Sequence, residues 1–323
     1  MPKEITHWLL ARRLAETARD TPFGPALAAE PDCLLLGAVA HDVFFYLTGD
    51  PAPGLRELPY ALHGSRGQDP GALILAQAEH AWRSGSYKAQ ALLAGLVSHA
   101  CADAVLHPLV FYQTGHLFSP DAAVASRARQ NHRALESLWD MHLTGGNLKG
   151  VQSWSLKDIA AGTGAPFEAL CALPFLARTA QATLEDTARA WDKALDTFVT
   201  IQSLARNELV AWTTQALFPV LPTKVREVAA LFYCPQYLER LERVRGVQVF
   251  RQPVTGEEQR ATLAELMDTA VAEAARLLDR LVPMVFASQA MALPGPLPSL
   301  ETGLPLIPGE AMVHFAAEPI MGL

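Results

Sequence analysis

The spacing of apolar residues constrains the fold of this 323-residue chain more than any other sequence feature. Apolar residues recur at intervals of three and four through most of the chain, Ala and Leu dominate, and runs of β-branched residues are scarce. This pattern is typical of amphipathic helices, because a helix returns to the same face every 3.6 residues. The sequence therefore predicts an all-α fold with few or no strands.

We expect one helical domain over residues 1–290, in which the first 145 residues and the helices of about 155–290 differ in character. The expected helices are 6–19, 31–48, 70–84, 88–107, 120–143, 165–217 with a break, 222–232, 234–244 and 257–290, and 145–154 is expected to be a loop. Nine of the ten histidines fall within the first 142 residues, so any histidine chemistry belongs to the first half. From residue 291 onward Pro and Gly become frequent, which predicts an extended arm over 291–323. An arm this apolar covers either its own body or a neighbouring copy, so the oligomeric state stays open.

Charge and cysteine content exclude several classes of protein. The net charge is −7 and the basic residues are scattered, which argues against a protein that binds duplex nucleic acid. The four cysteines are widely spaced and argue against a disulfide framework.

The N-terminal segment lacks an apolar signal-peptide core, so we expect a cytoplasmic protein. Residues 33–46 and 91–112 are apolar but include His and Asp side chains that are costly in lipid, so we expect buried helices and no transmembrane segment.

Two histidine and carboxylate pairs have the spacing of neighbours on one helix face. His99 precedes Asp103 by four residues, and His132 precedes Glu136 by the same interval. Residues four apart on a helix have Cβ atoms roughly 5–6 Å apart, close enough to bind one metal ion. Zinc takes both imidazole nitrogen and carboxylate oxygen as ligands. The alternative for either pair alone is an ordinary solvated ion pair on a helix surface.

The apolar surroundings of the carboxylates favour a metal centre over surface ion pairs. Asp103 lies within a long apolar run, and the adjacent His41 and Asp42 lie within another, at residues 36–46. An ionised carboxylate in such a setting is expensive unless it is paired or binds a metal. Two such carboxylates among several histidines therefore predict a metal site.

Three further histidines are candidate ligands. His107 precedes Pro108, so we expect the helix to end there and the imidazole to turn toward a neighbouring site; the alternative is a helix C-terminal cap. His63 is expected in a loop, where the alternative is an ordinary surface histidine. His7 lies on the first amphipathic helix, where the alternative is a core histidine bonded to backbone.

In order and residue type, this set resembles the zinc-dependent phospholipase C family over about residues 5–143. The matching segments are Ile5-Thr6-His7, residues 40–46 with His41-Asp42, Leu62-His63-Gly64, residues 98–108 with His99, Asp103 and His107, and His132 with Glu136. Members of this family are all-α and hold a three-zinc cluster that cleaves phosphodiesters.

The resemblance implies two or three zinc ions per chain. It implies one zinc held by Asp42, His63, His99 and Asp103, a second held by His107, His132 and Glu136, and a third shared between Asp103 and His7. Secreted members complete the third site with an N-terminal Trp, whereas Trp8 is internal here, which makes His41 a weaker candidate ligand. If the cluster is intact, metal-ion chemistry makes Asp42 our candidate for the catalytic carboxylate that orients or deprotonates the attacking water.

The expected function is zinc-dependent hydrolysis of a phosphodiester, in a phospholipid or a small phosphate ester. The first alternative is an HD-type metal phosphohydrolase built on His41-Asp42, His7 and Asp103. That alternative leaves the remaining candidate ligands unexplained. The second alternative is a non-catalytic, metal-containing module that binds lipid or protein. No linear motif reports the identity of the substrate.

Overall fold

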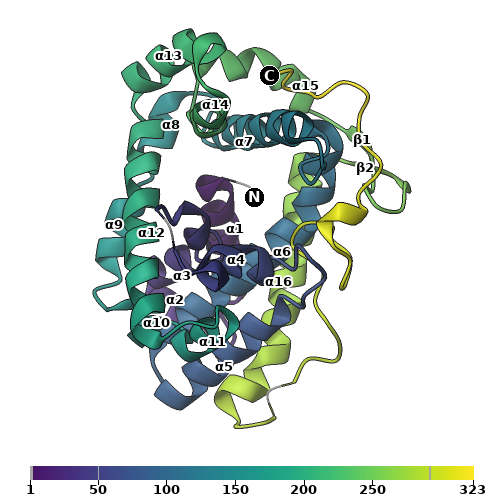
Figure 1. Ribbon diagram of the computed structural model, residues 1–323. Coiled ribbons are helices and arrows are strands. Elements are labelled where there is room, and N and C mark those ends of the chain that lie inside the picture. The colour runs from purple at the N-terminus through teal and green to yellow at the C-terminus, as the bar shows by residue number, and fades with distance from the viewer. Residues whose placement is uncertain (1–2, 50, 291) are drawn as a thin grey trace.

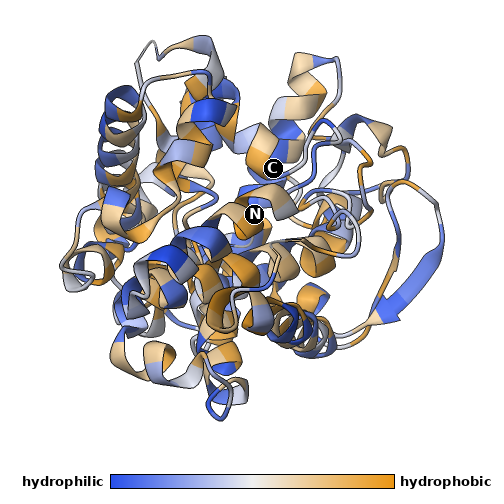
Figure 2. Cartoon of the chain, turned by 90° about the horizontal axis from the view of Figure 1, so that it is seen from below, coloured by the Kyte–Doolittle hydropathy of each residue, from blue (hydrophilic) through white to orange (hydrophobic). Residues whose placement is uncertain are grey.

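The computed structural model describes residues 3–49, 51–290 and 292–323, and its architecture is all-α (Figure 1). Over these residues the strands β1 (Gln248–Arg251) and β2 (Glu258–Ala261) form one antiparallel hairpin, and the other long elements are helices. The helices carry apolar and polar residues side by side (Figure 2), as the three- and four-residue spacing predicts. The expected fold class is confirmed.

The first half of the chain is organised around one long buried helix, α6. The elements of this half are α1 (Glu4–Thr17), α2 (Gly24–Ala29), α3 (Pro31–Gly37), the 3-10 helix η1 (Val43–Tyr46), α4 (Pro53–Leu62), α5 (Gly71–Ser84), α6 (Tyr87–Thr114), α7 (Ala122–Leu143), α8 (Leu148–Gln152) and α9 (Leu156–Gly162). Helices α1, α2, α3, α5 and α7 all contact α6. Helix α6 is long and apolar enough to cross a membrane, but 83% of its most apolar window is buried inside the protein. That burial is typical of a core helix.

Two glycines allow α3 and α6 to approach each other closely. A Cβ atom on Gly37 would lie 2.3 Å from the carbonyl oxygen of Leu92, and one on Gly95 would lie 2.2 Å from the carbonyl oxygen of Leu34. Any larger residue at these positions would force the helices apart. The contact fixes the end of α3, and the turn that follows it, against the middle of α6.

The expected helix over residues 31–48 is wrong, because α3 ends at Gly37. Three-residue turns follow, in which the N–H groups of Val39, Ala40 and Asp42 donate to carbonyls three residues earlier. His41 and Asp42 therefore lie in a tight turn before η1 rather than on a helix. The turn keeps both side chains buried.

The expected end of α6 at His107 is also wrong, since the helix continues through Pro108 to Thr114. A proline inside a helix removes one hydrogen bond and costs about 3 kcal/mol. The residues beyond it, including Leu109, Val110 and Phe111, are buried. Burying each such side chain contributes about 1.5–3 kcal/mol, so tertiary packing outweighs the local preference.

The second half of the chain wraps the first half. Its elements are α10 (Phe167–Leu170), α11 (Leu173–Thr179), α12 (Leu184–Ala205), α13 (Glu208–Leu217), η2 (Phe218–Val220), α14 (Thr223–Ala229), η3 (Pro235–Arg240), α15 (Leu241–Val244) and α16 (Leu263–Phe286). The helix expected over 165–217 with a break is in fact four helices, α10 to α13. The helix expected over 257–290 begins only at Leu263, because strand β2 occupies the first residues of that range. Helix α16 starts at a capping box between Thr262 and Glu265 and packs along α6. Helix α8 lies within the region expected to be a loop.

Residues 292–323 form an extended arm with one short 3-10 helix, η4 (Gly309–Ala311), and the arm packs on its own chain (Figure 1, yellow). Its backbone N–H groups donate to body carbonyls: Leu300 to His63 at 2.9 Å and Gly309 to Ser65 at 2.8 Å. Because these bonds satisfy backbone groups that would otherwise be buried unpaired, they hold the arm against the end of α4.

Candidate metal centre

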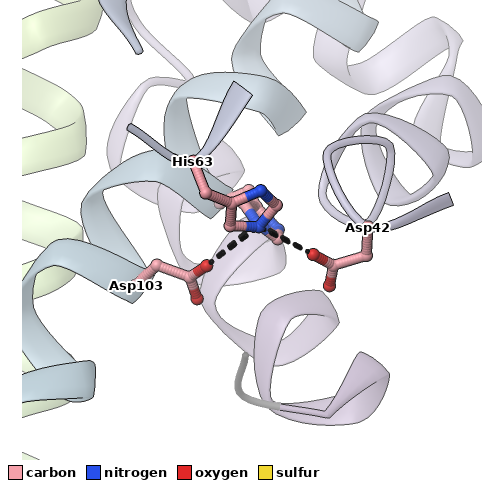
Figure 3. Close-up of side chains that lie close together, drawn as sticks. Asp42, His63 and Asp103 are labelled. Carbon is pink, nitrogen blue, oxygen red and sulfur yellow. Dashed lines mark hydrogen bonds and ion pairs between the residues drawn. The ribbon is translucent and has the colours of Figure 1, made fainter. Parts of the chain in front are cut away.

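The first cluster gathers residues from three elements around one point. Asp42 comes from the turn before η1, His63 follows the last residue of α4, and His99 and Asp103 come from one face of α6. One ligand atom from each lies within 4.8 Å of those of the other three, and all four side chains are buried. In Figure 3 the His63 ring stands between the two carboxylates, with Nε2 3.0 Å from Asp42 Oδ1 and 3.8 Å from Asp103 Oδ2.

The second cluster adjoins the first along α6. His107 lies one turn beyond Asp103, and α7 supplies His132 and Glu136, with all ligand atoms again within 4.8 Å of one another. His132 Nε2 is 2.9 Å from Glu136 Oε1. His107 Nε2 is 3.8 Å from that same oxygen and 3.8 Å from Asp103 Oδ1. Since His107 reaches both carboxylates, Asp103 lies between the two clusters.

Three of the imidazoles are oriented in the same way, with Nδ1 bonded to a backbone carbonyl and Nε2 directed into a cluster. The acceptors are Pro59 for His63 at 2.7 Å, Ala38 for His99 at 2.8 Å, and Leu300 for His107. A carbonyl only accepts, so each Nδ1 carries the proton. A neutral ring then presents the lone pair of Nε2, the form in which histidine binds a metal.

Imidazole nitrogens and carboxylate oxygens converge in these clusters, which favours positive charge between them, carried by a proton or by a metal ion. Burial opposes the charged form of His99, but Asp103 and Asp42 outweigh burial and raise its pKa to about 9. Burial likewise opposes the ionised form of Asp103, yet His107 and His99 hold the pKa of that carboxyl well below its usual range. A shared positive charge is therefore favourable at this point. Imidazole nitrogen with carboxylate oxygen is the donor set of zinc, so these residues fit the metal.

His7 and His41 lie at the edge of the first cluster. His7 Nε2 is 3.3 Å from Asp103 Oδ1, and its ring stacks on His99 at 4.1 Å between centroids. The His41 ring also stacks on the His99 ring, with 4.6 Å between the two centroids. Neither ring nitrogen of His41 has a hydrogen-bond partner among the described residues, and burial lowers its pKa well below the usual value. His7 thus lies beside Asp103, and neither His7 nor His41 is part of the two clusters, so the third site implied by the resemblance stays a prediction.

Both clusters open onto one cavity of about 460 Å³. Among the described members of the first cluster, Asp42 lines this cavity, and His132 and Glu136 line it from the second. Its apolar wall is made by Phe45, Tyr46, Tyr60, Phe111, Leu117 and Phe118. A cavity of this size with a few convergent polar groups is typical of a small-molecule or cofactor site.

The C-terminal arm contributes to the site, although no sequence motif predicts this contribution. The Leu300 carbonyl orients His107 across 193 positions of sequence. Next to it, Glu301 lines the cavity and accepts a hydrogen bond from Ser65 Oγ at 2.9 Å. Burial raises the pKa of Glu301. The only trace of this role in the sequence is a polar Ser-Leu-Glu-Thr segment inside an apolar, Pro-rich arm.

An all-α fold with two adjoining clusters of buried histidines and carboxylates is the architecture of a protein able to hold metal ions at neighbouring positions. Residues 6–159, just under half of the chain, match the family described as zinc dependent phospholipase C. The match includes both clusters and His7, while residues 160–323 lie outside it. Comparison with curated proteins and comparison with solved structures each gave no match.

Proposed function

We propose that this protein is a zinc-dependent phosphodiester hydrolase of the phospholipase C type, acting on a phospholipid or a small phosphate ester. The observation that carries the proposal is the orientation of His63, His99 and His107, whose Nδ1 atoms are held by carbonyls and whose Nε2 atoms face carboxylates. Such ring fixation is typical of metal-binding histidines. When bound, closely spaced zinc ions would stabilise phosphoryl oxygens and lower the pKa of a water molecule toward 7.

The chain itself supplies the proton acceptor and the walls of the site. Burial opposes ionisation of Asp42, but His99 and His63 outweigh burial and lower the pKa of its carboxyl, which keeps it ionised near neutral pH. Because Asp42 faces the cavity, its carboxylate is placed to orient a water molecule and accept its proton. The aromatic side chains Phe45, Tyr46 and Tyr60 line the cavity beside it.

Two alternatives remain to be separated by experiment. The HD-type hydrolase uses His41, Asp42, His7 and Asp103, and it leaves the second cluster without a role. The family match favours the phospholipase C type over it. A non-catalytic binding module would keep the metal sites without turnover.

We also propose a cytoplasmic location, with which four free thiols are compatible.

The test is elemental analysis of metal in protein purified without chelators, together with His99→Ala and Glu136→Ala variants. We expect two or three zinc ions per chain, fewer in both variants, and an unchanged number in the control His80→Ala, which lies outside both clusters. Iron or manganese that is insensitive to Glu136→Ala would favour the HD-type enzyme.

Turnover separates the hydrolase from the binding module. We expect metal-loaded protein to hydrolyse short-chain phosphodiesters and Asp42→Asn to abolish turnover while keeping the helical circular dichroism spectrum. Wild-type activity in Asp42→Asn would remove Asp42 from the mechanism. Bound zinc without any turnover would favour the binding module.

A further inference from the structure

Cationic side chains gather on the cavity wall beside the second cluster. Helix α7 places Arg129 three residues before His132 and Arg133 one residue after it, and both line the cavity. Lys224 of α14 lines the same wall. Residues three apart on a helix are neighbours, with Cβ atoms about 5–6 Å apart. Both arginine side chains are therefore attached to α7 within one helical turn of His132.

The two arginines lie close to that cluster on the same helix. Arg129 precedes His132 by three residues, and Arg133 precedes Glu136 by three residues. Arg133 also interacts electrostatically with the Glu136 carboxylate. A group bound at the second cluster therefore lies within reach of both arginine side chains.

One carboxylate offsets this positive charge only in part. Glu227 pairs with Arg129 Nη1 at 3.2 Å and with Lys224 Nζ at 3.1 Å, and it also accepts a hydrogen bond from Ser126. Arg133 donates instead to the backbone carbonyl of Glu227 at 2.7 Å. Arg129 and Lys224 thus share one carboxylate, while Arg133 is bonded to a backbone carbonyl, so the three cationic side chains of this wall outnumber the Glu227 carboxylate beside them.

We propose that Arg129, Arg133 and Lys224 bind a second anionic group of the substrate, so that the substrate is a phosphodiester whose headgroup carries a further phosphate or carboxylate. The inference rests on the proposed function. A scissile phosphodiester has one negative charge, and the metal clusters are the site for it. The three cationic side chains are therefore not needed to bind the scissile group. The planar guanidinium of arginine matches the geometry of carboxylate and phosphate.

The test uses soluble dihexanoyl lipids in two matched pairs. Phosphatidylserine differs from phosphatidylethanolamine by one carboxylate, and phosphatidylinositol 4-phosphate differs from phosphatidylinositol by one phosphate. Binding is measured by calorimetry on full-length, zinc-loaded protein with non-hydrolysable phosphonate analogues of these lipids, and turnover is measured on the lipids themselves. The comparison is between Arg129→Gln and the control Arg127→Gln, an exposed position on the same helix outside the cavity.

We expect the anionic member of at least one pair to bind about tenfold more tightly, and the pair that shows it identifies carboxylate or phosphate as the preferred group. Arg129→Gln should remove the preference and Arg127→Gln should keep it. Equal affinity within both pairs, or a preference that survives Arg129→Gln, would overturn the inference. Turnover without preference leaves the proposed function standing alone, whereas preference without turnover supports the anion site and contradicts the hydrolase.

Discussion

Replacing Gly303 with Ala tests whether the C-terminal arm holds a metal ligand in place. Gly303 closes the turn after Leu300 with a φ of +70°, and its N–H donates to Ser299 at 2.9 Å. A Cβ atom at this position would lie 2.5 Å from the carbonyl oxygen of Ala104 and 3.1 Å from Pro108. Both contacts are on α6, on either side of the turn that carries His107.

The expected effect follows from strain and displacement together. A non-glycine residue in the left-handed region costs about 1–2 kcal/mol. To reach ordinary contact with Ala104, the arm must move away from α6 by about 1 Å, because a Cβ contact below 3.0 Å is not tolerated. That movement weakens the hydrogen bond from His107 to Leu300. Loss of such a partner typically costs 10–100-fold in metal affinity, so we expect zinc to bind about tenfold more weakly.

The assay is competition for zinc against a chromophoric chelator, with unfolding by denaturant measured in parallel. The control is Gly295→Ala on the same arm, where a Cβ atom meets nothing within 4 Å. Nitrogen-15 spectra of the imidazoles add a direct readout, since His107 in the wild type carries its proton on Nδ1. If Gly303→Ala lost stability but kept wild-type zinc affinity and the wild-type His107 spectrum, the arm would have no positioning role.

Two further predictions concern pH and packing. Burial raises the pKa of Glu4 from 4.5 to about 7, so the folded chain holds this proton more tightly than the unfolded chain. Stability should therefore fall as pH rises from about 4.5 to 7, by up to about 3 kcal/mol, and Glu4→Gln should flatten this dependence in denaturant titrations. An equally steep fall in the variant would exclude Glu4 as its source. Gly95→Ala should destabilise the protein by about 3 kcal/mol, because its Cβ would lie 2.2 Å from Leu34 O; a loss below about 1 kcal/mol would contradict the close packing of α3 on α6.

The sequence by itself determined the features that depend on local geometry. Helical periodicity is a property of neighbouring residues, so the all-α class and the helices that carry the ligand pairs were readable from spacing. His99 with Asp103 and His132 with Glu136 share a helix face because four residues make about one turn. Apolar neighbours of Asp42 and Asp103 indicated burial, which the structure shows for both carboxylates.

Local rules failed where packing competed with them. Pro108 was expected to end α6, but buried residues beyond it outweigh the lost hydrogen bond and carry the helix to Thr114. Periodicity also suggested a continuous helix through His41 and Asp42. The close approach of Gly37 to α6 and the tight turns after it replace that helix.

Only the tertiary structure decided which distant residues complete the site. The carbonyl of Leu300 orients His107, and Glu301 enters the cavity beside Ser65, although both come from an arm with no helical or strand pattern. The cationic wall likewise needs Lys224 of α14 to meet Arg129 of α7. Such contacts leave no periodic trace in the sequence, because they satisfy polar groups across the fold rather than along one helix.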